Sequence, residues 1–207
     1  MAHPGKKLLF MGSEFAHFIE WKYDDQLDWF LLMYDRHPQV RQYVKTLNHL
    51  YSSTPAFYEL ERTWDGFQWI TPNDTDNSVL AFLRTDARGN VVLCVVNFTP
   101  VFHPIYRIGL PMEGTLTELL NSDRVEYGGS NQYNAFTIRT QSGEMNGFPW
   151  HVFLFAIGIN IRFIVKGGKE TAIDRCQVDG RSCKHPNSSQ LRAFRIQLLL
   201  CAQEQWQ

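Results

Sequence analysis

The chain opens with a short apolar segment that its pattern predicts to be a buried β-strand. Residues 6–11 end in Leu8-Leu9-Phe10-Met11, and Gly12-Ser13 close the segment. Consecutive apolar positions, without alternation, are typical of a parallel sheet that is covered on both faces. A long loop rich in aromatic and acidic residues follows, over residues 14–37. Long loops that follow a strand are more often functional than idle.

A helix is predicted next, from Pro38 to the residues before Pro55. Its apolar positions recur every three or four residues, at Val40, Val44, Leu47 and Leu50. Proline in the first turn supports this start, and Pro55 bounds the end. Residues 1–56 therefore form one βα unit. One unit cannot bury a parallel strand, which needs neighbours at its edges and helices on its faces, so we expect this unit to be the last of a larger structure.

From residue 57 the pattern changes to short apolar segments separated by turn residues. Residues 78–83 and 91–98 flank Asp86-Ala87-Arg88-Gly89-Asn90, a hairpin signature in which glycine supplies a positive φ. Further segments continue the series, namely residues 66–70, 106–109 and 115–120, with a turn cluster at 71–74. This spacing is typical of an all-β sandwich, which we place at residues 57–152.

Residues 153–207 differ from the sandwich pattern. Residues 153–165 are almost continuously apolar, but the segment is too short to span a bilayer and contains Arg162. One late strand is predicted there. The polar remainder carries three of the four cysteines. Two interpretations of residues 153–207 stay open, a divergent genuine tail and a shifted reading frame.

Composition narrows the class of protein. A hydrophobic content of 44% with 20% charged residues is ordinary for a soluble globular domain. The formal net charge of -1 gives no electrostatic case for nucleic acid or for an anionic membrane. No signal peptide is recognisable, so we expect a cytoplasmic protein. The cysteines show no zinc-site spacing, and we expect neither a metal nor a cofactor.

Several motifs resemble the bacterial 1,4-α-glucan (glycogen) branching enzymes of the α-amylase superfamily. Residues 1–15 are similar to the stretch that forms the eighth barrel strand of that family, and Glu20-Trp21 and residues 27–29 are similar to the loop after it. Later motifs resemble its carboxy-terminal β-domain, at residues 47–51, 77–82, 96–100, 106–109, 120–123 and 127–130. The resemblance covers about the first three-quarters of the chain. His17 departs from it, because the family more often has Gln at this position.

The resemblance implies a mainly β fold, a carboxy-terminal all-β sandwich preceded by the last βα unit of a (β/α)₈ barrel. It divides the chain into residues 1–56, 57–152 and 153–207. It also implies a retaining transfer of an α-1,4-glucan segment to a 6-hydroxyl, through an Asp nucleophile and a Glu acid. In the family these acids lie upstream of the segment that matches Met1–Gly5. We therefore assign no catalytic residue, and we expect a truncated gene model that is inactive alone.

Three residues are candidates for facing glucan in the complete enzyme: Glu14, Phe15 and Trp21. Glu14 follows the predicted strand, at the end where barrel enzymes build their sites, but it also fits a loop cap or a partner for a barrel arginine. Phe15 and Trp21 have two interpretations as well, stacking on glucose rings or pinning the loop onto the helix.

Other side chains give weaker signals. Trp64 and Trp69 fit either a glucan platform or packing on a strand face. Asp24, Asp25 and Asp28 are interpreted as a solvated acidic loop and not as a calcium site. We assign no role to three histidines, which are His3, His37 and His49.

The first functional hypothesis is a branching-enzyme fragment that acts on α-glucans such as glycogen and amylose. The alternatives are a carbohydrate-binding or scaffold β-module without catalytic activity, and a fragment of another amylase-superfamily member. In each case we predict poor solubility, because the opening strand lacks its partner strands.

Overall fold

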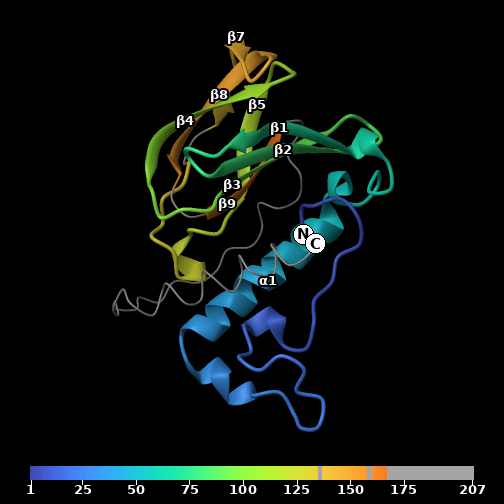
Figure 1. The fold of residues 1–207 in the computed structure, drawn as a ribbon, viewed down its shortest axis with the longest axis vertical. Helices are drawn as coiled ribbons and strands as arrows, with labels where there is room; N and C mark the ends of the chain where they lie inside the picture. The colour runs from blue at the N-terminus through green and yellow to red at the C-terminus, as the bar shows by residue number, and fades with distance from the viewer. Residues whose placement is uncertain (135–136, 158–159, 167–207) are drawn as a thin grey trace. The chain divides into compact units, whose positions relative to one another are not determined.

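The computed structural model describes residues 1–134, 137–157 and 160–166 (Figure 1). Before the β-domain it has one α-helix, α1 (Arg36–Ser53). Short 3₁₀ turns flank this helix, at η1 (Ser13–Phe15), η2 (Trp29–Met33), η3 (Pro55–Phe57) and η4 (Trp64–Gly66). The predicted helix is confirmed, and it begins two residues before Pro38.

The β-domain consists of two antiparallel sheets. The larger sheet has six strands in the order β1-β2-β3-β9-β5-β6. Its strands are β1 (Phe67–Asp74), β2 (Val79–Thr85), β3 (Val91–Asn97), β9 (Asn160–Lys166), β5 (Thr115–Asn121) and β6 (Ile138–Arg139). The smaller sheet has three strands in the order β4-β8-β7, which are β4 (His103–Leu110), β8 (Phe148–Ile157) and β7 (Gln141–Met145). Residues 125–127 add one more 3₁₀ turn, η5.

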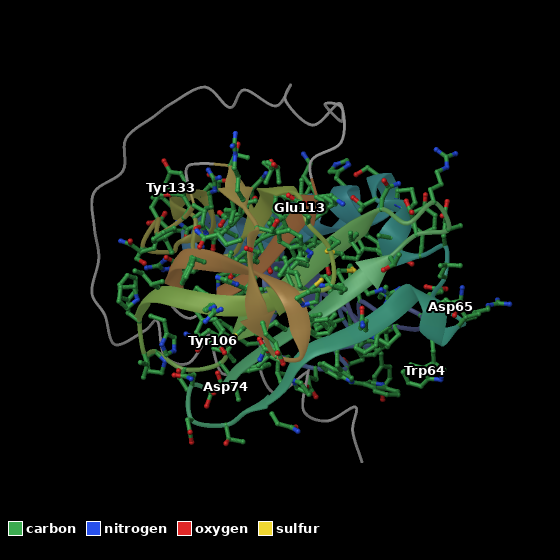
Figure 2. All side chains as sticks on the ribbon, turned by 90° about the horizontal axis from the view of Figure 1, so that it is seen from above. Trp64, Asp65, Asp74, Tyr106, Glu113 and Tyr133 are labelled. Carbon is green, nitrogen blue, oxygen red and sulfur yellow. The ribbon has the colours of Figure 1, made fainter. Side chains whose placement is uncertain are left out.

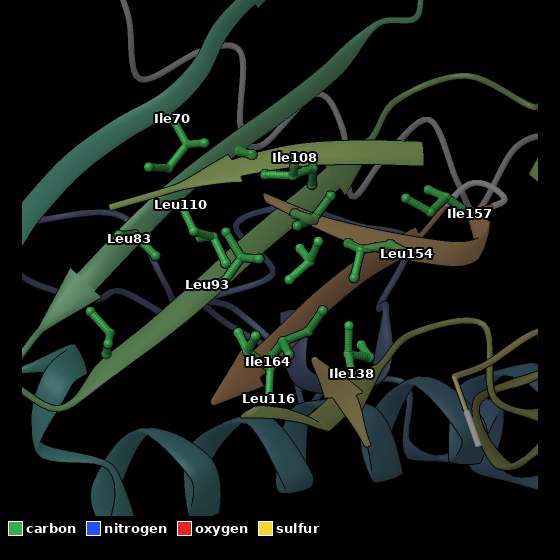
Figure 3. Packing of buried hydrophobic residues seen from close by; sticks show 14 of the residues in the cluster. Ile70, Leu83, Leu93, Ile108, Leu110, Leu116, Ile138, Leu154, Ile157 and Ile164 are labelled. Carbon is green, nitrogen blue, oxygen red and sulfur yellow. The ribbon is translucent and has the colours of Figure 1, made fainter. Parts of the chain in front are cut away.

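The main core fills the space between the two sheets. Alternate residues of β4 and β8, such as Ile108 and Leu154, face Leu93 of β3 and Ile164 of β9 (Figure 3). This arrangement is the predicted all-β sandwich, so the predicted fold class is confirmed.

The six-stranded sheet is covered on its other face as well. A second cluster of buried residues joins Val92 and Cys94 of β3 and Phe163 of β9 to Tyr43 and Leu50 of α1. Because β3 has a covered face on each side, its residues are apolar at consecutive positions and do not alternate with polar ones. Burial raises the pKa of the Cys94 thiol, so this cysteine remains a neutral apolar side chain.

Two predicted strand boundaries differ from the structure. The turn predicted at residues 71–74 is wrong, because β1 continues to Asp74 and the turn follows at residues 75–78. The Asp74 carboxylate accepts hydrogen bonds from the amide and the side chain of Asn77. These hydrogen bonds stabilise a turn that follows the Pro-Asn-Asp cluster, whereas the sequence predicted the turn within that cluster.

The single late strand predicted at residues 153–165 is instead two strands, β8 and β9. The expected boundary at residue 152 falls inside β8, and β9 pairs with both β3 and β5. The sandwich therefore continues to Lys166. The rest of the expected tail, with Cys176, Cys183 and Cys201, lies outside the described residues.

The predicted opening strand is not formed. Residues 6–10 have no regular structure, and Leu8 is 74% exposed. A β-strand needs a partner for its backbone groups, and none of the strands in the described ranges pairs with this segment.

No helix in the described ranges is long and apolar enough to cross a membrane.

Candidate functional site

The candidate residue Glu14 lies in η1, directly after the predicted opening strand. Gly12 makes this turn possible: its φ is 86°, and a Cβ atom added to it would lie 2.8 Å from the Cβ atom of His17. The turn directs Phe15 into the protein and leaves Glu14 partly exposed.

Phe15 is fully buried. Its ring stacks on Trp29, with 5.0 Å between the ring centroids, and meets the His17 ring edge-on at 5.7 Å. Its carbonyl oxygen lies 2.9 Å from Nδ1 of the buried His37. These contacts match the packing interpretation of Phe15, and they leave its ring covered in this structure.

His17 and Asp28 organise the loop after η1. His17 Nδ1 lies 2.7 Å from the Ile19 carbonyl oxygen, and the Asp28 amide nitrogen lies 3.0 Å from His17 Nε2. The Asp28 carboxylate accepts a 2.6 Å hydrogen bond from Lys22, which lowers the pKa of Asp28. Asp25 also lies 3.7 Å from Lys22, so Asp25 and Asp28 are both paired with this cation.

The same region exposes many large apolar side chains. Trp21 is 68% exposed, has a φ of 53°, and contacts Phe10 at 5.9 Å between ring centroids. We call the following exposed residues the N-terminal apolar set: Leu8, Leu9, Phe10, Phe18, Ile19, Trp21, Tyr23, Trp29, Phe30, Met33 and Tyr34. Isolated exposed apolar residues are normal, but such a concentration in one short segment marks an interaction site.

A second exposed aromatic group lies at the start of β1. Trp64 is 81% exposed and contacts Phe67 at 6.4 Å between ring centroids. Trp69 is 41% exposed and packs edge-on against Phe67 and Phe82. Trp69 therefore serves strand-face packing, whereas most of the Trp64 surface is free for a ligand.

Sequence reasoning missed a groove where β1 and β4, each an edge strand of its sheet, come together. We call it the β1–β4 groove; its polar lining includes Thr71, Asp74, Asn77, His103, Tyr106, Arg107 and Asn146. The Tyr106 hydroxyl donates a hydrogen bond to the Asp74 carboxylate. Figure 2 shows Asp74 and Tyr106 next to each other, at the opposite end of β1 from Trp64. No sequence motif linked these residues, because they come from separate strands.

The remaining predicted assignments concern metals and histidines. No cluster of three or more histidine, cysteine or acidic residues that could hold a metal occurs in the ranges that the structure describes. His3 Nδ1 lies 2.7 Å from the Pro4 carbonyl oxygen, and His49 lies on α1. None of these geometries forms a catalytic arrangement of nucleophile, base and orienting group.

Comparison with known proteins finds a family model that matches most of the β-domain. Residues 69–155 match the family model described as the C-terminal all-beta domain of alpha amylase. This matched stretch is similar to that domain. Within it lie Trp69 and the β1–β4 groove, whereas Glu14, Phe15 and Trp21 precede it.

The similarity to curated relatives covers more of the chain than residues 69–155. The chain is 46% identical over 152 residues to the 1,4-alpha-glucan branching enzyme GlgB of Oceanobacillus iheyensis, which covers 72% of this chain and 23% of that protein. It is 51% identical over 138 residues to the protein of the same name from Pseudomonas fluorescens, covering 65% of this chain and 19% of that protein. It is 43% identical over 162 residues to the protein of the same name from Halothermothrix orenii, covering 78% of this chain and 25% of that protein.

These relatives confirm the resemblance to branching enzymes. The chain spans a quarter or less of the length of these three curated relatives. The comparisons do not test the glucan-facing assignment of Glu14, Phe15 and Trp21, which stays a prediction.

Proposed function

We propose that the chain acts as the carboxy-terminal part of a 1,4-α-glucan branching enzyme in cytoplasmic glycogen biosynthesis. Such an enzyme cleaves an α-1,4-glucan and transfers the cut segment to a 6-hydroxyl. We assign the nucleophilic Asp and the acidic Glu of that reaction to the upstream part of the relatives' length. Similarity to enzymes of this name over about three-quarters of the chain supports the proposal.

The observation that carries the proposal is the exposure of the N-terminal apolar set. Its members lie in residues 8–34, within the part that resembles the end of a catalytic barrel. Burying the members other than Trp21 against neighbouring barrel strands and helices would remove apolar surface from water, at roughly 25 cal/mol for each Å². The segment of residues 6–10 would then gain the strand partners that it lacks here.

Within that complete enzyme we propose that Glu14 and Trp21 face the glucan. Both lie in the loop that follows the segment that would close the barrel, and barrel enzymes build their sites at this end of their strands. Trp21 presents an exposed ring, on which a glucose unit can stack, and Glu14 presents a partly exposed carboxylate for sugar hydroxyls. Phe15 supports them from below through its packing on Trp29.

A fusion experiment tests this proposal. The chain alone, mixed with amylose, is expected to leave the iodine spectrum unchanged. The chain fused to the carboxyl end of the upstream segment of the Oceanobacillus iheyensis relative is expected to branch amylose. The control is the same fusion protein with the relative's catalytic Asp replaced. Branching by the 207-residue chain alone, or a folded but inactive fusion, would contradict the proposal.

The exposed Trp64 favours a second function, a carbohydrate-binding β-module. An indole ring that is 81% exposed on an edge of the domain offers a flat apolar platform to a sugar ring. In native gels that contain glycogen, we expect retarded migration that is lost in Trp64→Ala and kept in Phe155→Ala, which removes another exposed ring of the β-domain. Free migration of the unmodified chain would rule out this function.

A further inference from the structure

Three side chains of the β1–β4 groove hold buried polar atoms that lack a hydrogen-bond partner within the described ranges. They are Thr71 Oγ1, His103 Nε2 and Arg107 Nε, half of the six such atoms found there. Thr71 is only 7% exposed. More than 90% of buried polar groups in proteins are paired, and the exceptions often mark a bound water or ligand. Their concentration in one groove therefore points to an occupant.

The shape of β1 explains why Thr71 faces the groove. Its pairing with β2 shifts between Trp69 and Thr71, and again between Thr71 and Asp74. Such irregularities act as β-bulges, which bend a strand and redirect its side chains. Because of the first shift, the consecutive residues Ile70 and Thr71 are both buried, where a regular strand would bury only one of them.

The charges of the groove favour a neutral occupant. The Asp74 carboxylate is already held by the Tyr106 hydroxyl and by Asn77, so it is not free to bind a cation. The groove lining holds one carboxylate, Asp74, and one guanidinium, Arg107, so these formal charges balance and an anion is not favoured either. Burial, together with the hydrogen bond to Asp74, raises the pKa of Tyr106 and keeps its hydroxyl protonated.

The free atoms specify the chemistry of that occupant. Arg107 Nε is a donor, the Thr71 hydroxyl both donates and accepts, and His103 Nε2 does one or the other according to its tautomer. Ile105, Pro72 and Met145 add apolar surface beside them. Hydroxyl groups combined with apolar C–H faces are the chemistry of a sugar ring.

We infer that the β1–β4 groove binds a neutral oligosaccharide, whose hydroxyl groups pair with Thr71, His103 and Arg107. The assignment of an α-1,4-glucan rests on the proposed function. The Trp64 platform lies just before β1, and the groove begins at Ile70 and reaches Asp74 at the other end of the strand, so the two are roughly 10–25 Å apart along an extended strand. One long glucan chain can therefore contact both.

Hydrogen exchange read by mass spectrometry tests the inference on the full chain. Maltoheptaose is expected to slow exchange in residues 70–77 and 103–107. Thr71→Val keeps the side-chain shape but removes the hydroxyl, so we expect the apparent Kd for maltoheptaose to rise about fivefold to tenfold. Thr75→Val is the matched control, because Thr75 lies in the following exposed turn, outside the groove lining, and should leave the Kd unchanged.

A thermal melt of the same variants separates binding from folding. Without sugar, Thr71→Val should raise Tm, because it removes a buried hydroxyl that has no partner. A higher Tm with an unchanged Kd would mean that only water pairs with these groove atoms, and it would overturn the inference. Absence of protection in both segments, or protection confined to residues 64–69, would also overturn it. Branching by the fusion protein is an independent readout, so failure here leaves the proposed function standing.

Discussion

Asp86 fixes the turn between β2 and β3. Its carboxylate accepts hydrogen bonds from the Arg88 amide at 2.9 Å, from the Asn90 amide at 2.8 Å and from the Asn90 side chain at 2.7 Å. Burial alone would raise the pKa of Asp86, but these hydrogen bonds outweigh it and the pKa lies below its usual value. With Gly89 at a φ of 79°, the turn aligns β2 with β3 from Val79↔Asn97 to Thr85↔Val91.

Asp86→Ala is expected to destabilise the chain at pH 7 by about 1–3 kcal/mol, since it removes the carboxylate that accepts three hydrogen bonds within the turn. The folded pKa is lowered, so the unfolded state binds more protons in this range. The contribution of Asp86 is complete above the unfolded pKa of 3.8 and is lost as pH falls through the folded value. Urea unfolding of both proteins from pH 7 down to pH 3 measures this contribution as a difference in unfolding free energy. If Asp86→Ala lost as much stability at pH 3 as at pH 7, the charge of Asp86 would not be the cause.

Residue patterns predicted this hairpin because its interactions are local. The Asp, Gly and Asn lie within five positions of one another, and their turn geometry follows from their own chemistry. The β1–β4 groove was not predictable in the same way. Thr71 and His103 come together only after two sheets have packed, and no spacing in the sequence records that contact.

Among the elements, β9 shows why sequence reasoning underestimated the β-domain. It lies between β3 and β5, in the middle of the six-stranded sheet, although it is the last described strand. Arg162 is a charged residue within its otherwise largely apolar sequence. In the structure the Arg162 guanidinium lies 3.1 Å from the Glu118 carboxylate of β5, and both side chains are buried. Arg162 also donates to the carbonyl oxygens of Phe155 and Gln132, so its charge is well paired.

Glu118→Ala is expected to destabilise the chain by about 3–5 kcal/mol, because it leaves a guanidinium buried without its carboxylate. The matched control is Glu144→Ala on edge strand β7, an exposed acid whose removal should change stability by about 0.5 kcal/mol or less. Chemical denaturation of the two variants gives the comparison. Equal stability of the two would mean that β9 does not insert between β3 and β5.

In the whole molecule, buried contacts tie the amino-terminal residues to the β-domain. Arg84 of β2 is fully buried and donates to the carbonyl oxygens of Ala2 and Phe57. Lys6 lies 3.0 Å from Glu61, whose carboxylate also accepts a hydrogen bond from Tyr51. The segment before Leu8 is therefore anchored, and the exposed apolar residues begin directly after this anchor.

This arrangement predicts how the chain behaves in solution. The residues of the N-terminal apolar set are each 45–78% exposed, so copies of the chain are expected to associate through them. Light scattering coupled to size exclusion should show mass that rises with concentration. Leu8→Lys combined with Phe18→Lys should reduce that association, because charged side chains oppose burial of the surface without touching either core cluster.

The control for this experiment is Val125→Lys together with Ile105→Lys, two exposed apolar residues of the β-domain that lie outside the set. These changes should leave association as it is in the unmodified chain. Joining the chain to the upstream segment of a relative should abolish association without any substitution, since the barrel would cover the same residues. A monodisperse monomer of the unmodified chain at high concentration would mean that this apolar surface needs no partner. The strongest structural support for a missing barrel would then be lost, while the β-sandwich and its groove would be unaffected.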